Sequence, residues 1–127
     1  SAAELGDFIG ASSGSTQRLT LYIPTEDRDG KPIRARETWF QRAIELLTKV
    51  GGGATVMPCR GAWYNSKSGK IIQENVDVVY TFVKARGFQQ NRASLRRFLH
   101  ELGIATNQGE VAFEFDGCFY RIDLFES

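Results

Sequence analysis

EVAFEFDGCFYRI, residues 110–122, predicts two β-strands joined by a tight turn at Asp116-Gly117. Asp-Gly favours a type I′ turn, because both central residues need positive φ, which glycine accepts freely and aspartate tolerates. With this two-residue loop, the directly opposed pairs are Val111 with Ile122, Phe113 with Tyr120, and Phe115 with Cys118. Directly opposed residues share a face, so this set forms one apolar surface that belongs to the core. The second surface is only partly polar, with Ala112, Glu114, Phe119 and Arg121.

Upstream of this hairpin, strand and helix patterns alternate. RLTLYIP, 18–24, predicts a short strand, and apolar residues at helical spacing predict helices over 36–50 and roughly 91–102. The glycines at 51–53 end the first helix, and Gly103 ends the second. Residues 54–64 predict a strand that either lies at a sheet edge or bulges at Pro58, with 70–75 as its hairpin partner. A further strand over 76–83 is apolar on both faces, which is typical of a central strand covered on both sides.

This order of elements predicts the fold class. Strand, helix, strand pair, strand, helix and strand pair match an α+β, ferredoxin-like (split β-α-β) antiparallel sheet with two helices on one face. We expect a single α+β domain over 17–127, preceded by a flexible N-terminal lead over 1–16. The second sheet face is left to solvent, a ligand or another subunit.

Size and composition exclude several classes of protein. The chain has 127 residues and a formal charge of +1, which gives no overall attraction to nucleic acid or to an anionic membrane. No apolar run is long enough to span a bilayer and the start does not read as a signal peptide, so we expect a cytoplasmic protein. Two cysteines and one histidine cannot readily supply a closed metal site, and no cofactor is expected. Buried reduced thiols are favoured over a disulfide.

Three motifs carry a resemblance to a known group of proteins. They are Gly-Gly-Ala-Thr at 52–55, Gly-x-Trp at 61–63 and Thr-Asn-Gln-Gly-Glu at 106–110. Over roughly residues 18–123 the chain resembles a group of small bacterial proteins of unknown function. The resemblance implies no catalytic residue, and it suggests a gene carried on a mobile element.

A basic stretch gives the strongest candidate for a binding site. Between residues 84 and 97 there are five cations and no acid: Lys84, Arg86, Arg92, Arg96 and Arg97. Arg92 is expected near a helix start, where the macrodipole disfavours a cation, and it repels Arg96 one turn on. A bound anion would relieve both effects, with Arg86 contributing from the preceding loop. The alternative, which we favour, is that Glu101 or acids of the terminal hairpin neutralise these arginines.

Other candidate residues lie in loops and at strand ends. A pocket between sheet and loops could involve Arg60, Trp63, Arg96 and Asn107. Thr106, Asn107 and Gln108 are favoured as partners of loop backbone groups rather than of a ligand. His100 is expected to be a surface residue, and the acids at 26–29 a solvated loop rather than a metal site. The glycines at 51–53 follow a helix, so they are not a phosphate-binding loop.

Two functions from different classes fit this sequence. The favoured one is a non-enzymatic interaction domain that forms a homodimer or higher oligomer through its open sheet face. The alternative is a small domain that binds an anionic ligand, or an enzyme, with a pocket between sheet and loops. No nucleophile-base pair supports an enzyme, and the aromatic strands lack the signature of an RNA-binding sheet, so nucleic acid is not favoured as a partner.

Overall fold

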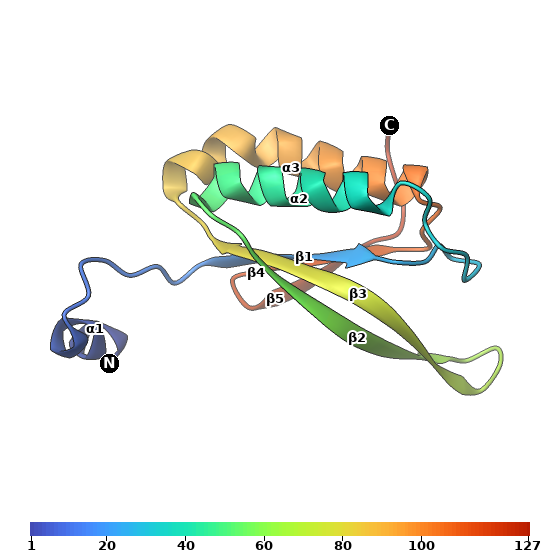
Figure 1. Cartoon of the computed structure of the whole chain (residues 1–127), viewed down its shortest axis with the longest axis horizontal. Coiled ribbons are helices and arrows are strands. Elements are labelled where there is room, and N and C mark those ends of the chain that lie inside the picture. Colours follow the sequence, from blue (N-terminus) through green and yellow to red (C-terminus); the bar gives the residue numbers. More distant parts are fainter.

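The computed structural model describes all residues from 1 to 127 and contains three helices and five strands. In chain order the elements are α1 (Ala2–Ile9), β1 (Arg18–Pro24), α2 (Arg36–Gly51), β2 (Thr55–Asn65), β3 (Lys70–Phe82), α3 (Ala85–Ala105), β4 (Val111–Phe115) and β5 (Cys118–Ile122). Helices α2 and α3 lie side by side over one face of the sheet, while α1 stands apart at the end of an extended segment (Figure 1). No helix has both the length and the apolar character that a membrane span requires.

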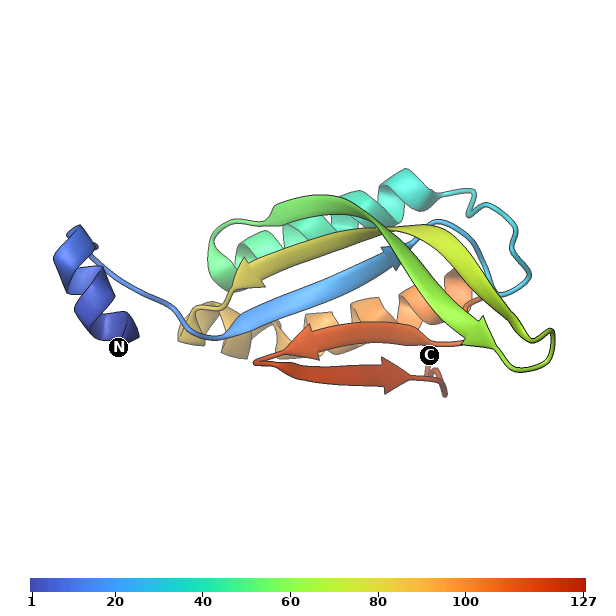
Figure 2. The ribbon, with the colours of Figure 1, turned by 90° about the horizontal axis from the view of Figure 1, so that it is seen from below.

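The five strands form one antiparallel sheet in the order β2-β3-β1-β4-β5 (Figure 2). Without β5 this is the strand order of the ferredoxin-like fold, with both helices on one face. The predicted fold class is therefore confirmed. Strand β2 lies at the edge, as Pro58 predicted, because proline has no N–H to give to a second neighbour.

The central strand β1 supplies the middle of the core. Leu19, Leu21 and Ile23 alternate toward the helices and are at most 1 % exposed. Apolar residues of both helices and of the neighbouring strands close around them: Ala43, Leu46, Leu47, Val50, Val79, Val83, Phe98, Leu99, Leu102 and Val111. The core is thus a single layer between the sheet and the two helices.

The terminal hairpin has the predicted register. Phe113 faces Tyr120 and Phe115 faces Cys118 across a turn in which Asp116 and Gly117 have φ of 52° and 81°. The Phe115 ring stacks on Phe88 of α3 with 5.0 Å between centroids, so the predicted apolar face does meet the core. The expectation of two buried thiols is wrong, because Cys118 lies on an edge strand and is exposed, while Cys59 is half-buried; both are free.

Three predicted boundaries are wrong. Residues 70–75 and 76–83 are one continuous strand, β3, and only its helix-facing side is covered. Helix α3 begins at Ala85 instead of 91, because Gly87 lets its first turn approach the last carbonyls of α2. Gly103 does not end this helix; it is buried, and the ring of Phe125 packs where a side chain would project.

Helix α1 forms within the segment expected to be a flexible lead. Ser1 and Glu4 close a capping box at its start, and Gly10 ends it in the left-handed conformation. None of its residues is buried. The division of the chain at residue 17 remains a prediction.

The contact between the end of α2 and β3 can be tested at Gly51. A side chain there would collide with Thr81 and with the Phe82 carbonyl, so Gly51→Ala should lower the free energy of unfolding by about 1–3 kcal/mol. Gly53→Ala is the matched control: nothing lies within 4 Å of the added carbon, and stability should hold or rise by up to about 1 kcal/mol. Urea denaturation of the three proteins measures both effects, and equal losses would refute the close approach.

Candidate functional site

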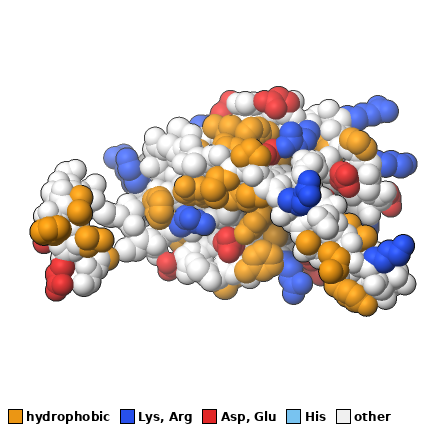
Figure 3. All heavy atoms as spheres, turned by 60° about the horizontal axis from the view of Figure 1, so that its bottom comes forward, with side chains coloured by type: hydrophobic (Ala, Val, Ile, Leu, Met, Phe, Trp, Pro, Cys, Tyr) orange, Lys and Arg blue, Asp and Glu red, His pale blue; other side chains and the backbone are white.

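The sheet face away from α2 and α3, which we call the open face, is rich in apolar and aromatic side chains. In register across the strands it carries Thr20, Tyr22, Met57, Cys59, Trp63, Ile72, Glu74, Val76, Val78, Tyr80, Phe82, Ala112, Glu114, Phe119 and Arg121. Figure 3 shows hydrophobic side chains gathered along this side of the molecule. Met57, Phe82 and Phe119 are 40–54 % exposed, so a substantial apolar surface lacks a partner.

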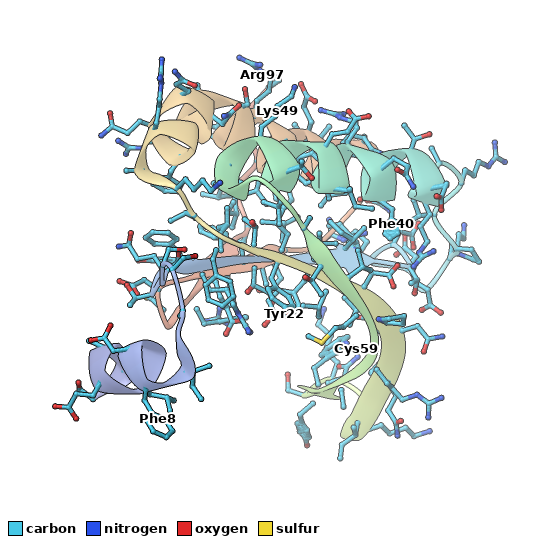
Figure 4. All side chains as sticks on the ribbon, turned by 60° about the vertical axis from the view of Figure 1, so that its left-hand side comes forward. Phe8, Tyr22, Phe40, Lys49, Cys59 and Arg97 are labelled. Carbon is cyan, nitrogen blue, oxygen red and sulfur yellow. The ribbon has the colours of Figure 1, made fainter.

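Tyr22 and Glu114 form a polar pair within the open face. The Tyr22 hydroxyl donates to Glu114 Oε2 at 2.7 Å, and Phe119 packs edge-on against the tyrosine ring. Burial, followed by the hydrogen bond and charge of Glu114, raises the pKa of Tyr22 to about 12. Tyr22 therefore stays protonated at neutral pH and acts as a hydrogen-bond donor, not as a base. Tyr22 and Cys59 both lie beneath the sheet in Figure 4.

A polar hollow of about 650 Å³ opens where β1 ends and α2 begins. We call it the Arg36 hollow; its lining is Thr25, Arg36, Pro58, Cys59, Arg60, Asn75, Val76 and Asp77. Strand β1 pairs with β3 only as far as Val76, so β3 has no neighbour on this side beyond that point. The Thr25 hydroxyl instead donates to the Asn75 carbonyl at 2.7 Å and holds the following loop against β3. Residues from both faces of the sheet consequently meet at this free edge.

Arg36 is anchored in the hollow by a carboxylate from the sheet. Its guanidinium donates to Asp77, which is only 8 % exposed, while Arg36 Nε is buried without a partner. Arg36 is also the first residue of α2, whose cap position, Ala35, offers no side-chain oxygen to the free N–H groups. A cation and the positive end of a helix dipole therefore coincide at one wall of the hollow, which favours a negative group there.

Two carboxyl groups without a cation lie beside this hollow. Glu74 directly precedes three lining residues of β3, and Glu26 follows the end of β1. Burial, and then the negative charge of Glu26, raise the pKa of Glu74. No lysine or arginine pairs with either carboxylate. This end of the sheet thus holds two carboxyl groups without a cation, the Arg36–Asp77 pair, and Arg60, which has no carboxylate within ion-pair distance.

The structure separates the residues predicted to share one pocket. Arg60 lines the Arg36 hollow, and Trp63 lies further along β2 on the open face, about half exposed. Asn107 fastens the loop after α3: its side-chain amide donates to Asp29 at 3.2 Å, and its carbonyl accepts from the Arg28 N–H. Gln108 likewise donates to the Glu26 carbonyl. The side chain of Gln108 therefore contacts a loop backbone group, as predicted, whereas the side chain of Asn107 contacts the Asp29 carboxylate.

The basic stretch lies over a second cavity. Arg92 and Arg96 line a groove of about 340 Å³ between α3 and the β4–β5 hairpin, which we call the α3–hairpin groove; Arg86 lies outside it, in the first turn of α3. The prediction that Arg92 stands near a helix start is wrong, because α3 begins at Ala85, about two turns earlier. Arg96 pairs with Glu126 at 2.5 Å, whereas Arg92 has no carboxylate within ion-pair distance.

His100 and the acidic loop have structural contacts. His100 Nδ1 accepts a hydrogen bond from the Glu126 N–H at 2.9 Å, and its ring meets Phe125 edge-on, so it fastens the C-terminal segment to α3. Asp27 accepts hydrogen bonds from the N–H groups of Lys31 and Asp29, which lower the pKa of its carboxyl. These contacts explain both residues without a ligand.

Sequence reasoning missed Arg36 and Glu74, and it assigned Glu26 to a solvated acidic loop. Arg36 and Asp77 lie 41 positions apart, and nothing in their local patterns links them. Glu74 did leave a signal: when 70–82 is read as one strand, it is the single acid among Ile72, Val76, Val78 and Tyr80 on one face. The prediction divided that strand at residue 75, so the lone acid was not recognised.

The fold and the cavity together define a ferredoxin-like α+β domain with a hollow of small-molecule size. No protein-family model and no curated protein matches the chain. Among solved structures, a phage SAM lyase in complex with S-methyl-5′-thioadenosine is similar over 88 % of this chain and 92 % of that chain, with a TM-score of 0.58 and 15 % identity. The apo form of a phage SAM lyase is similar over 89 % of this chain and 93 % of that chain, with a TM-score of 0.57 and 16 % identity. The periplasmic divalent cation tolerance protein CutA from Archaeoglobus fulgidus is less similar, at a TM-score of 0.42 and 13 % identity over 87 % of this chain and 85 % of that chain. At sequence identities this low, the similarity to the lyase shows only that the two chains share a fold.

The raised pKa of Glu74 predicts that the stability of the protein depends on pH. The pKa of Glu74 is raised in the folded chain, so between the ordinary pKa of 4.5 and the raised pKa the native state keeps a proton that the unfolded state has released. The free energy of unfolding therefore falls as the pH rises through this range. Glu74→Gln should remove that fall and raise the free energy of unfolding at pH 7 by less than about 1 kcal/mol. Glu45→Gln, an exposed acid of α2, is the control. Thermal melts between pH 4 and 8 measure the effect, and parallel curves for Glu74→Gln and the wild type would contradict it.

Proposed function

We propose that the chain is a small-molecule-binding domain that takes a sulfonium nucleoside of the S-adenosylmethionine class at the Arg36 hollow. Its open sheet face joins copies of the chain into a homo-oligomer. The observation that carries the proposal is the pair of carboxyl groups, Glu74 and Glu26, which oppose each other without a cation. Two like charges held together favour any ligand that brings a positive group between them.

The charges around the hollow fit a zwitterion better than a simple anion. Arg36 and Arg60 line it and would receive a carboxylate, with the uncapped start of α2 adding its dipole. Glu74 and Glu26 would receive a sulfonium or ammonium group. S-adenosylmethionine carries a carboxylate, an ammonium and a sulfonium in one molecule, so its charges complement both sets.

Size and fold support the same ligand class. A hollow of about 650 Å³ lies within the usual range for sites that hold small molecules, roughly 300–1,000 Å³. The lyase that resembles this chain over nearly its full length was solved with S-methyl-5′-thioadenosine. That thioether lacks the sulfonium charge and the amino-acid end, so comparing the two ligands separates the contribution of charge from that of the nucleoside.

Lyase activity is the second candidate function. Breaking the bond between sulfur and the γ-carbon of S-adenosylmethionine leaves both electrons on sulfur and gives neutral S-methyl-5′-thioadenosine. The substrate's own carboxylate can form the new bond to that carbon and close a lactone. This route needs positioning of the carboxylate, which Arg36 would supply, and no protein nucleophile. It therefore agrees with a hollow that contains no histidine.

The ligand is tested by isothermal titration with S-adenosylmethionine and S-methyl-5′-thioadenosine. Glu74→Gln should weaken S-adenosylmethionine by about tenfold, since a hydrogen-bonded or charged contact of roughly 1.5 kcal/mol is lost, and leave the thioether nearly unchanged. Arg60→Gln should also weaken S-adenosylmethionine. Arg97→Gln is the matched control, because Arg97 projects from the helix layer, far from the hollow (Figure 4).

The outcomes separate the candidate functions. Absence of binding at millimolar concentration, or an equal loss for both ligands in Glu74→Gln, would refute the proposed site. When S-adenosylmethionine binds, chromatography of the incubated mixture distinguishes the functions. Release of more S-methyl-5′-thioadenosine than there is protein identifies an enzyme, and unchanged S-adenosylmethionine identifies a binding domain.

Self-association is tested on the open face. Charge in a buried apolar contact is costly, so Met57→Glu with Phe82→Glu should convert the oligomer to a monomer in multi-angle light scattering. Ile104→Glu is the control, because Ile104 is 50 % exposed on α3, comparable to Met57 at 40 % and Phe82 at 44 %. A wild-type chain that is monomeric at micromolar concentration, or equal dissociation by all three changes, would refute association through this face.

A further inference from the structure

Helix α1 presents an apolar stripe that contacts nothing in its own chain. Leu5, Phe8 and Ile9 share one side at spacings of three and four residues, and they are 61 %, 86 % and 70 % exposed. Figure 4 shows Phe8 pointing away from the rest of the molecule. An isolated helix of eight residues is not stable in water, because nucleation costs more than so few hydrogen bonds return. This helix therefore needs a surface to pack against.

One side of the apolar stripe is acidic. Glu4 and Asp7 are the charged residues of α1, and the helix has no lysine or arginine. An acidic amphipathic helix is repelled by the anionic surface of a membrane, since helices that bind there present cations. Its complement is an apolar groove with a positive rim.

The α3–hairpin groove has these properties. Its floor contains Leu95, Leu99, Phe113 and Ile122, and two arginines of α3, Arg92 and Arg96, also line it. Arg92 has no carboxylate within ion-pair distance, and Arg96 pairs only with Glu126 of the C-terminal segment. Apolar surface and unneutralised positive charge are thus combined in one cavity.

We propose that α1 of one copy docks in the α3–hairpin groove of a second copy. Leu5, Phe8 and Ile9 enter the apolar floor, and Glu4, which flanks the stripe, faces the arginines. The segment between α1 and β1 carries the helix away from its own body, which places it to reach a neighbour (Figures 1 and 2). This exchange is independent of the proposed ligand site, because the groove lies on the helix side of the sheet and shares no lining residue with the Arg36 hollow.

Cross-linking between two chains tests the contact directly. In a Cys59→Ser, Cys118→Ser background, one chain carries Ala2→Cys, on the stripe side of α1, and the other carries Gln89→Cys, beside the groove. A short bismaleimide added to the mixture should give a covalent two-chain product. Gln41→Cys, on the exposed side of α2, replaces Gln89→Cys in the control and should give no such product.

The same cysteines placed together in one chain decide which groove α1 occupies. Linked pairs of chains support the proposal. A compact cross-linked monomer would overturn the proposal, because α1 would then occupy the groove of its own chain. A yield of cross-linked product no greater than that of the control would show that α1 does not dock in this groove at all. These readouts do not depend on ligand binding or on the open face.

Charge reversal provides the second test. Arg92→Glu should lower the yield of the cross-link by about tenfold, whereas Arg97→Glu, a neighbouring arginine that does not line the groove, should leave it unchanged. Glu4→Arg in the chain that supplies α1 should then restore the yield with the Arg92→Glu partner. Circular dichroism confirms that each variant is folded and keeps its helix content. A folded Arg92→Glu chain with full yield, or a loss that Glu4→Arg fails to restore, would refute the charge match.

Discussion

Strand β1 is the constraint on which the whole molecule depends. Its seven residues pair with β3 on one side, three of them also pair with β4 on the other, and its inward side chains form the middle of the core. The two halves of the fold, each a helix with its hairpin, meet in the sheet only through this strand. Leu19, Leu21 and Ile23 therefore determine at once where both helices lie and where the sheet is continuous.

The Arg36 hollow is a consequence of how short that strand is. β3 continues in the direction of Lys70 beyond the point where β1 turns away at Pro24. The uncovered edge is filled by polar groups, and Asp77 can remain charged there only because Arg36 reaches it from the start of α2. Charge of both signs is concentrated at this end because the apolar layer stops there.

Sequence reasoning succeeded where local chemistry determines geometry. Asp116-Gly117 fixed the register of the last hairpin, and Pro58 placed β2 at an edge; from these elements and the two helices the fold class followed. It failed where contacts between residues far apart in the sequence determine the structure. Glu74 and Asn75 interrupt the apolar pattern, so β3 was divided, although pairing with β2 carries it through. The first turns of α3 contain one large apolar residue, Phe88, and are helical because they pack against α2 and β4.

The candidate site was less accessible to prediction than the fold. Arg60 was predicted as a candidate binding residue, but its neighbours in the hollow come from the loop after β1, from α2 and from β3, and only the folded chain brings them together. The clustered arginines of α3 were conspicuous in the sequence, and they proved to border a different cavity. A cluster of charges in the sequence can indicate a charged surface. The residues of a binding site can be identified only when the fold shows which elements come together.

The β2–β3 ribbon differs from the rest of the sheet in its mechanical character. No residue from Thr55 to Val76 is buried, and the hairpin end of β2 and β3 extends beyond both helices (Figure 1). Segments with little buried apolar surface open at a lower free-energy cost than the core, so amide hydrogens here exchange with solvent earlier than those of β1. Arg60 and Asn75 lie in this ribbon, whereas Arg36 and Asp77 belong to the packed body. One wall of the hollow is therefore rigid and the opposite wall is compliant, and fluctuations of the ribbon alter the width of the cavity without disturbing the fold.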